Sequence, residues 1–283
     1  MGMSMGPSMA ATGQYFHAKR GAAMGLAVAG SSLGGVIFPI ALSKMLNSGS
    51  LSFGWTVRIL GFLILGILFP SCFAIRARLP PRAGQFFLPA AFKELPYIGI
   101  LGSVFLMMIG LFTPFFYLPT YAVMHGMSSQ LASYLVAILN ASSFFGRVIP
   151  GILADKIGPL NMLMASGLCT GILVLAWQAI NTNASIIVFS VLYGFFSGAI
   201  VSLMSFAISK VPKNPQNIGT YMGMGMAVCS IAALIGPPIN GALVTHYHVF
   251  KQAMDLSGVF IVVGALGIIL AKLARGEGLF AKN

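Results

Sequence analysis

Arg147 is the residue best suited to specific chemistry in a chain that carries few charges. It lies eight positions before Asp155, which corresponds to about 12 Å along an α-helix. A guanidinium at that depth in a hydrophobic segment costs at least ~2.5 kcal/mol on insertion scales, and such groups usually face a cavity or a partner. Two interpretations stay open. Arg147 binds an anionic or polar substrate, or it has a structural role through backbone carbonyls or snorkelling.

Asn140 and Ser143 extend this polar character along the same segment. They precede Arg147 by seven and four positions, so the three side chains are expected near one helix face. We call these three residues the polar stripe and predict that it binds substrate, with a hydrogen bond between helices as the alternative. Phe116 and Tyr117 are further candidates for lining a substrate path, with lipid contact or packing as the alternative.

The other reactive side chains form no recognisable site in the sequence. The three cysteines are far apart in apolar runs and predict small buried hydrophobic side chains: Cys72, Cys169 and Cys229. The histidines His125, His246 and His248 fall in predicted turns and are interpreted as solvated. No His/Cys/Asp/Glu cluster and no nucleophile–base spacing appears. We therefore expect neither an enzyme nor a bound metal or other cofactor.

The composition decides which solvent surrounds most of the chain. Hydrophobic residues make up 58% of 283 positions and charged residues only 7%, whereas a soluble domain carries about 25% charged residues. Most of the surface must therefore face lipid. The net charge of +12 would suggest nucleic acid, but the basic residues form short groups between apolar runs. We expect no nucleic-acid partner.

Eight apolar runs are long enough to cross a bilayer, which requires about 20 residues per helix. The runs are unbroken, whereas barrel strands alternate in polarity, so helices are favoured. We predict an all-α polytopic membrane helix bundle with these spans: Ala22–Leu46, Thr56–Ile75, Tyr97–Met124, Leu131–Leu153, Leu160–Ile180, Ile186–Ile208, Ile218–Thr245 and Met254–Leu273. Met1–Phe16 resembles the end of another span and is too short to cross by itself.

The distribution of basic residues tests this count. If the turn with Lys19 and Arg20 faces the cytoplasm, alternation puts twelve basic residues on that side. The other side receives three, Lys44, Arg58 and Lys251. Cytoplasmic connections are enriched in lysine and arginine, so the asymmetry supports both the number and the direction of the spans.

The least hydrophobic connection, residues 76–95, predicts a domain boundary. We expect residues 1–75 to be the remainder of an N-terminal helix bundle (the end of helix 4 and helices 5 and 6). Residues 76–95 are expected to form a cytoplasmic linker, and residues 96–283 a complete six-helix bundle (helices 7–12) with a short tail. The unequal halves lead us to expect that the chain lacks its first helices.

Glycines and prolines predict how the spans pack. The pairs Gly30/Gly34, Gly167/Gly171 and Gly194/Gly198 put glycine on one helix face, which lets backbones approach closely. Prolines within or near the spans predict kinks. They are Pro39, Pro70, Pro114, Pro119, Pro150, Pro237 and Pro238.

The segment from Gly151 to Gly158 carries a motif with a physical role. Glycine permits close helix approach, Asp155 can cap or pair at a helix end, and Gly158 permits a tight turn. Gly151, Asp155, Lys156 and Gly158 match the loop signature G-x-x-x-D-[RK]-x-G of the major facilitator superfamily. The resemblance implies a cytoplasmic gating motif in which the acidic residue joins a network of charges and dipoles.

Further segments resemble monocarboxylate-transporter-like permeases of fungal type. The similar segments are residues 15–21, 29–35, 54–58, 78–82, 115–119, 146–151 and 236–241. The resemblance implies a twelve-helix fold with the substrate between two six-helix halves, and this chain would lack helices 1–3. Arg147 matches a substrate-binding arginine. The mammalian carriers have aspartate four positions earlier, where this chain has Ser143.

We therefore predict a secondary active or facilitative transporter that works by alternating access. The expected substrate is a small organic solute, a monocarboxylate or a related metabolite or vitamin. The alternative is a truncated product or a membrane scaffold without transport activity. Expected partners are the solute, the lipid bilayer, and the missing helices or a second chain. The expected location is multi-pass in the plasma membrane, the vacuole or another organelle.

Overall fold

The computed structural model describes residues 2–16, 18–47, 52–75, 87–274 and 276, and these residues form helices and connections without a strand. The predicted all-α class is confirmed. The α-helices are α1 (Gly2–Tyr15), α2 (Arg20–Asn47), α3 (Phe53–Ala74), α4 (Leu95–Leu111), α5 (Thr113–Met124), α6 (Ser129–Ile157), α7 (Pro159–Ala176), α8 (Asn183–Ser209), α9 (Ile218–Tyr247) and α10 (Lys251–Leu273). Short 3-10 helices are η1 (Pro89–Lys93), η2 (Trp177–Ala179) and η3 (Pro215–Asn217).

The predicted membrane spans coincide with the helices to within a few residues. In the part of the chain that the structure describes, eight helical segments are long and apolar enough to cross a membrane. Helix α1 has 14 residues and reaches only about 21 Å, in agreement with a segment too short to cross. Residues 48–51 and 76–86, which include most of the predicted linker, lie outside the described residues.

The span predicted over 97–124 consists of two helices, α4 and α5, which meet near Pro114, where the sequence predicts a kink. Helix α4 ends at Leu111, and α5 begins at Thr113. Pro114 explains the break, because proline has no N–H to donate to the carbonyl of Gly110 and its ring would clash there. The Tyr193 hydroxyl of α8 instead donates to the Leu111 carbonyl at the break.

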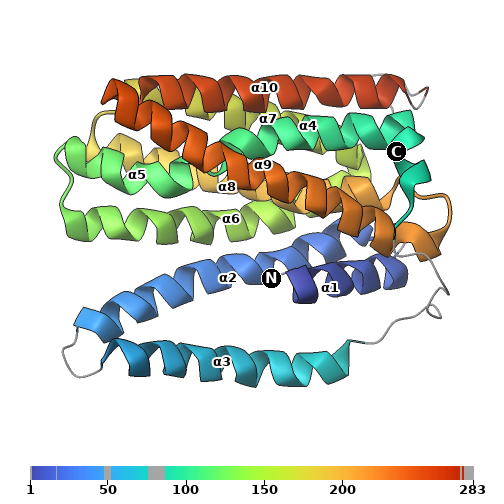
Figure 1. Ribbon diagram of the computed structural model, residues 1–283, viewed down its shortest axis with the longest axis horizontal. Helices are drawn as coiled ribbons and strands as arrows, with labels where there is room; N and C mark the ends of the chain where they lie inside the picture. Colours follow the sequence, from blue (N-terminus) through green and yellow to red (C-terminus); the bar gives the residue numbers. More distant parts are fainter. Residues whose placement is uncertain (1, 17, 48–51, 76–86, 275, 277–283) are drawn as a thin grey trace.

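Glycines set how closely α6 approaches its two main neighbours, α2 and α8 (Figure 1). A Cβ atom added to Gly146 would lie 1.9 Å from the Phe195 carbonyl oxygen of α8. One added to Gly25 of α2 would lie 2.4 Å from the Arg147 carbonyl oxygen. Any larger residue would push these backbones apart, so both faces of α6 require glycine at the crossing.

The helices alternate in direction, and their basic termini gather at one end of the bundle, on the right in Figure 1. Hydrogen bonds between helices hold this end together. Asp155 accepts from the backbone of Gly21, and Arg20 donates to the Ser209 carbonyl. We call it the basic end, and its described basic residues include Arg20, Lys93, Lys156, Lys210 and Lys213. The opposite end carries Lys44, His125, His248 and Lys251. Which end faces the cytoplasm stays a prediction.

Helix α3 lies at the edge of the molecule (Figure 1) and packs chiefly on α2. Thr56 is its buried residue, while large apolar side chains along the helix, such as Phe62 and Phe69, are more than 60% exposed. A bilayer helix exposes such side chains to lipid or to other helices.

Candidate functional site

Arg147 projects from α6 toward α2. Its side chain is only 9% exposed, and one terminal nitrogen donates to the Val28 carbonyl at 2.9 Å and to the Ser31 hydroxyl. Its Nε is buried without a hydrogen-bond partner. Leaving a buried donor unpaired costs roughly 1–3 kcal/mol, so the arginine is held across the helix interface with part of its donor capacity unused.

The other two members of the polar stripe face the same helix. The Ser143 hydroxyl lies 2.8 Å from the Ser32 hydroxyl. The Asn140 amide donates to the Val136 carbonyl and lies against Gly35, where an added Cβ would come within 2.5 Å of its oxygen. Arg147, Ser143 and Asn140 therefore line the α2–α6 interface together. Their role as substrate ligands stays a prediction.

Phe116 and Tyr117 are not brought to this interface. Phe116 is 61% exposed on α5. The Tyr117 hydroxyl donates to the Pro237 carbonyl of α9 at 3.0 Å, and its ring packs near that of Phe250. Tyr117 thus links α5 to the proline pair of α9.

The predicted gating motif contacts the first turn of α2. The Asp155 carboxylate accepts from the Gly21 N–H at 2.8 Å and from the Ala22 N–H at 3.0 Å. These N–H groups begin a helix and have no partner within it, and the negative charge also suits the helix dipole. Asp155 of α6 therefore caps α2 in place of a local residue.

The remaining motif residues support this contact. A Cβ atom on Gly151 would lie 2.7 Å from the Gly21 carbonyl oxygen. Gly158 has φ 103°, a conformation that favours glycine, and it ends α6. Lys156 is exposed. Arg20, buried to 8% exposure, adds a second tie by donating to the Ser209 carbonyl of α8 at 3.2 Å.

A buried polar cluster at the helix break was not predicted. The Thr113 and Ser257 hydroxyls lie 2.7 Å apart. The Asn240 amide donates to Thr113 at 2.8 Å and its oxygen accepts from Ser257 at 3.2 Å. The side chains come from α5, α9 and α10, and all are at most 1% exposed. Their polarity in apolar spans is a signal that sequence reasoning could have used, but their meeting depends on the tertiary packing.

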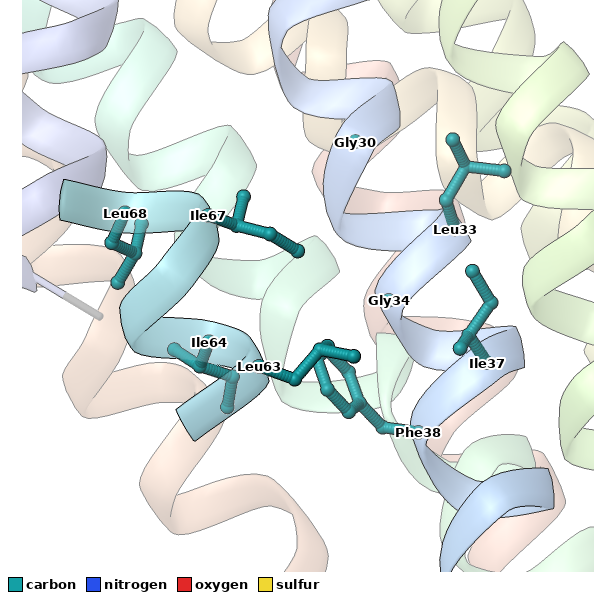
Figure 2. A pocket seen from close by; sticks show the side chains of 9 residues that line it. All are labelled: Gly30, Leu33, Gly34, Ile37, Phe38, Leu63, Ile64, Ile67 and Leu68. Atoms are coloured by element: carbon teal, nitrogen blue, oxygen red, sulfur yellow. The ribbon is translucent and has the colours of Figure 1, made fainter. Parts of the chain in front are cut away.

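Several openings between described residues lie outside these contacts. The first is a groove of about 290 Å³ between α2 and α3, lined by apolar side chains and by Gly30 and Gly34 (Figure 2). The second is a pocket of about 350 Å³ at the opposite end, where residues of α5, α10 and the nearby connections meet. The described residues contain no group of three or more His, Cys, Asp or Glu side chains that could hold a metal ion.

Comparisons with known proteins identify relatives along the whole chain. The model of the "Major Facilitator Superfamily" matches residues 1–216 and 151–276. The aspyridones efflux protein apdF of Emericella nidulans is 55% identical over 98% of this chain and 57% of its own length. The agnestins efflux protein AgnL12 of Paecilomyces divaricatus is 40% identical over 98% of this chain and 63% of its own length.

A solved structure supports the same fold. The fucose:proton symporter FucP of E. coli superposes with a TM-score of 0.71, at 17% identity, over 93% of this chain and 71% of that protein. The sequence relatives are named as transporters and efflux proteins and not as enzymes. This chain spans about 57–63% of the length of the two efflux relatives, and it is an integral, multi-pass membrane protein.

Proposed function

This chain belongs to the major facilitator superfamily, and on that premise we propose that it moves a small organic compound out of a compartment by alternating access. The proposed binding position is the α2–α6 interface at the polar stripe. The observation that carries this proposal is the buried Arg147 guanidinium, which spans the interface with an unpaired Nε. When this interface opens, Arg147 would exchange its hydrogen bonds with Val28 and Ser31 for hydrogen bonds with a ligand.

We propose an anionic or strongly polar organic compound as the substrate. Arginine suits carboxylates and similar oxyanions because its planar donors match them in geometry. The relatives are efflux proteins for aspyridones and agnestins by name, which favours an organic product over a nutrient. A monocarboxylate or a vitamin is the narrower proposal that the permease resemblance supplies.

Transport in reconstituted vesicles tests the proposal. We expect the chain to carry a labelled organic acid across the bilayer, and Arg147→Ala to reduce the rate at least tenfold, which is about 1.4 kcal/mol of lost interaction. Arg147→Lys should restore part of the rate. Arg58→Ala is the matched control, since Arg58 lies at the opposite end over the ring of Trp55. Unchanged transport by Arg147→Ala would remove this residue from the binding site.

We also propose that residues 1–75 and 96–283 act as two bundles that rock against each other, joined by the linker 76–95. The capping of α2 by Asp155 supports this division, because it is a contact between the two segments at the basic end. Such a contact forms when that end is closed and must break when it opens. Its loss should therefore favour the open state.

The groove between α2 and α3 supports a partner for this part of the chain. Leu33, Ile37, Leu63 and Ile67 line it (Figure 2) and are 47–60% exposed. Gly30 has no neighbouring atom within 4 Å of an added Cβ. We propose that further transmembrane helices, from the same polypeptide or a second chain, fill the groove. The alternative function is a membrane scaffold, which would carry no labelled acid in the vesicle assay.

A photocrosslinking amino acid at Ile64 tests this partner in native membranes. We expect it to capture a helical membrane polypeptide, whereas the same probe at Val263, an exposed position of α10, serves as the control on the other side of the bundle. Capture of lipid alone at Ile64 would contradict the proposal.

A further inference from the structure

The pocket at the opposite end is walled by aromatic side chains that hydrogen bonds hold in position. The Tyr121 hydroxyl donates to the Ile180 carbonyl at 2.7 Å and to the Asn181 side-chain oxygen at 3.2 Å. Its ring lies 4.0 Å from that of His125 and 5.6 Å from that of Phe250, centroid to centroid. The wall is thus fixed before any ligand binds, which reduces the ordering cost of binding.

Two side chains that line this pocket, Lys251 and Asn181, can offer donors to a ligand. Lys251 lines it from the first turn of α10, where the helix dipole adds positive potential. His125 Nδ1 lies 2.9 Å from the Tyr121 carbonyl oxygen, so this nitrogen donates within the aromatic wall and is not available to a ligand. Asn181 uses its oxygen for Tyr121 and keeps its NH₂ group available.

The carboxylate nearest along the chain to Lys251 is held by another side chain and does not line the pocket. Asp255, one turn after Lys251, accepts a hydrogen bond from the Gln178 amide. No described carboxylate lies within ion-pair distance of Lys251. Among the residues that line the pocket, Lys251 is the one with a formal charge, and its ammonium lies beside the aromatic wall.

From this geometry we infer that the opposite-end pocket binds a small aromatic carboxylate. The volume of about 350 Å³ lies within the range of small-molecule sites. The ring of the ligand packs against the nearly perpendicular rings of Tyr121 and Phe250, and its carboxylate pairs with the Lys251 ammonium. The site is separate from the polar stripe, which lies on α6 against α2, so a ligand bound there touches neither Arg147 nor its partners.

Tryptophan fluorescence tests this inference independently of transport. The chain has two tryptophans, and a Trp55→Phe background leaves Trp177, whose ring lies 5.3 Å from that of Tyr121. We expect 4-nitrobenzoate to quench this fluorescence with saturation in the purified protein. The neutral 4-nitrobenzamide should bind at least tenfold more weakly. Linear quenching without saturation, or equal affinity for the two probes, would overturn the inference.

Variants locate the bound probe. Lys251→Met should weaken nitrobenzoate binding about tenfold and leave the benzamide unchanged, while Lys251→Arg should retain the affinity. Lys44→Met, another exposed lysine at the same end, is the matched control and should have no effect. Arg147→Ala should also leave binding intact. If Arg147→Ala abolishes the saturable quenching, or Lys251→Met leaves it unchanged, the probe does not occupy this pocket.

Discussion

At the scale of single residues, the contacts of Asp155 and Asn240 show two uses of polarity in a lipid environment. Asp155 satisfies two N–H groups that begin α2. Asn240 closes a hydrogen-bonded triangle with Thr113 and Ser257. Buried polar groups without partners are costly in hydrocarbon, so each of these side chains is stabilising only while its partners stay in place.

Replacing Asp155 should loosen the contact between α2 and α6. Loss of a capping side chain costs about 0.5–2 kcal/mol, so Asp155→Ala should lower the apparent Tm of the purified protein. Asp155→Asn, which keeps one acceptor, should lower it less. Lys156→Ala alters an exposed neighbour and is the control. Equal Tm values for Asp155→Ala and the unmodified chain would show that the cap contributes no stability.

The triangle around Asn240 should behave as one unit. A double-mutant cycle with Asn240→Ala and Thr113→Val should give a coupling free energy of about 1 kcal/mol, the range for groups in one hydrogen-bonded network. The measurement is the free energy of denaturant unfolding of the two single variants and the double variant. Additive effects would mean that the two side chains act independently.

At the scale of elements, glycine contacts decide which helices touch. Gly146 and Gly194 form the crossing of α6 and α8, where an added Cβ would lie 1.9 Å and 2.3 Å from carbonyl oxygens of the partner helix. A Cβ atom added to Gly30 of α2 would instead meet no atom within 4 Å. Gly30 and Gly194 both belong to pairs of glycines spaced four residues apart, but their roles in packing differ. Only the glycines at the crossing permit close approach of two helix backbones.

The pair Gly146→Ala and Gly30→Ala tests this distinction. Gly146→Ala forces α6 and α8 apart and should destabilise the protein by about 1–3 kcal/mol, as overpacking does. Gly30→Ala should be neutral or stabilising by up to ~1 kcal/mol, because alanine favours the helix. Thermal unfolding of the two variants side by side is the measurement. A greater loss for Gly30→Ala would contradict the packing of α6 against α8.

At the scale of the whole molecule, helix direction separates a basic end from an opposite end. Arg20, Lys156 and Lys210 share one end, and Lys44, His248 and Lys251 share the other (Figure 1). Lysine and arginine remain on the cytoplasmic side during insertion, so the basic end should face the cytoplasm.

Single cysteines introduced into a variant without Cys72, Cys169 and Cys229 test this orientation. In sealed cells, a membrane-impermeant maleimide should label His248→Cys from outside and leave Lys213→Cys unlabelled until the membrane is permeabilised. If both positions react from the same side, the alternation of the helices is wrong.

The sequence by itself determined the membrane class, the number of long spans and the shared face of Asn140, Ser143 and Arg147. These features can be read from a single segment, because the length of an apolar run and the helical period are properties of that segment alone.

Only the tertiary structure decided that this face meets α2, that Asp155 caps a helix that begins 135 positions earlier, and that Thr113, Asn240 and Ser257 meet. The break at Phe112 also required it, because a proline in a membrane helix either kinks or breaks it, depending on which neighbours bind the released carbonyls. Contacts between distant helices depend on steric fit and on partners for buried polar groups, and neither is encoded within one segment.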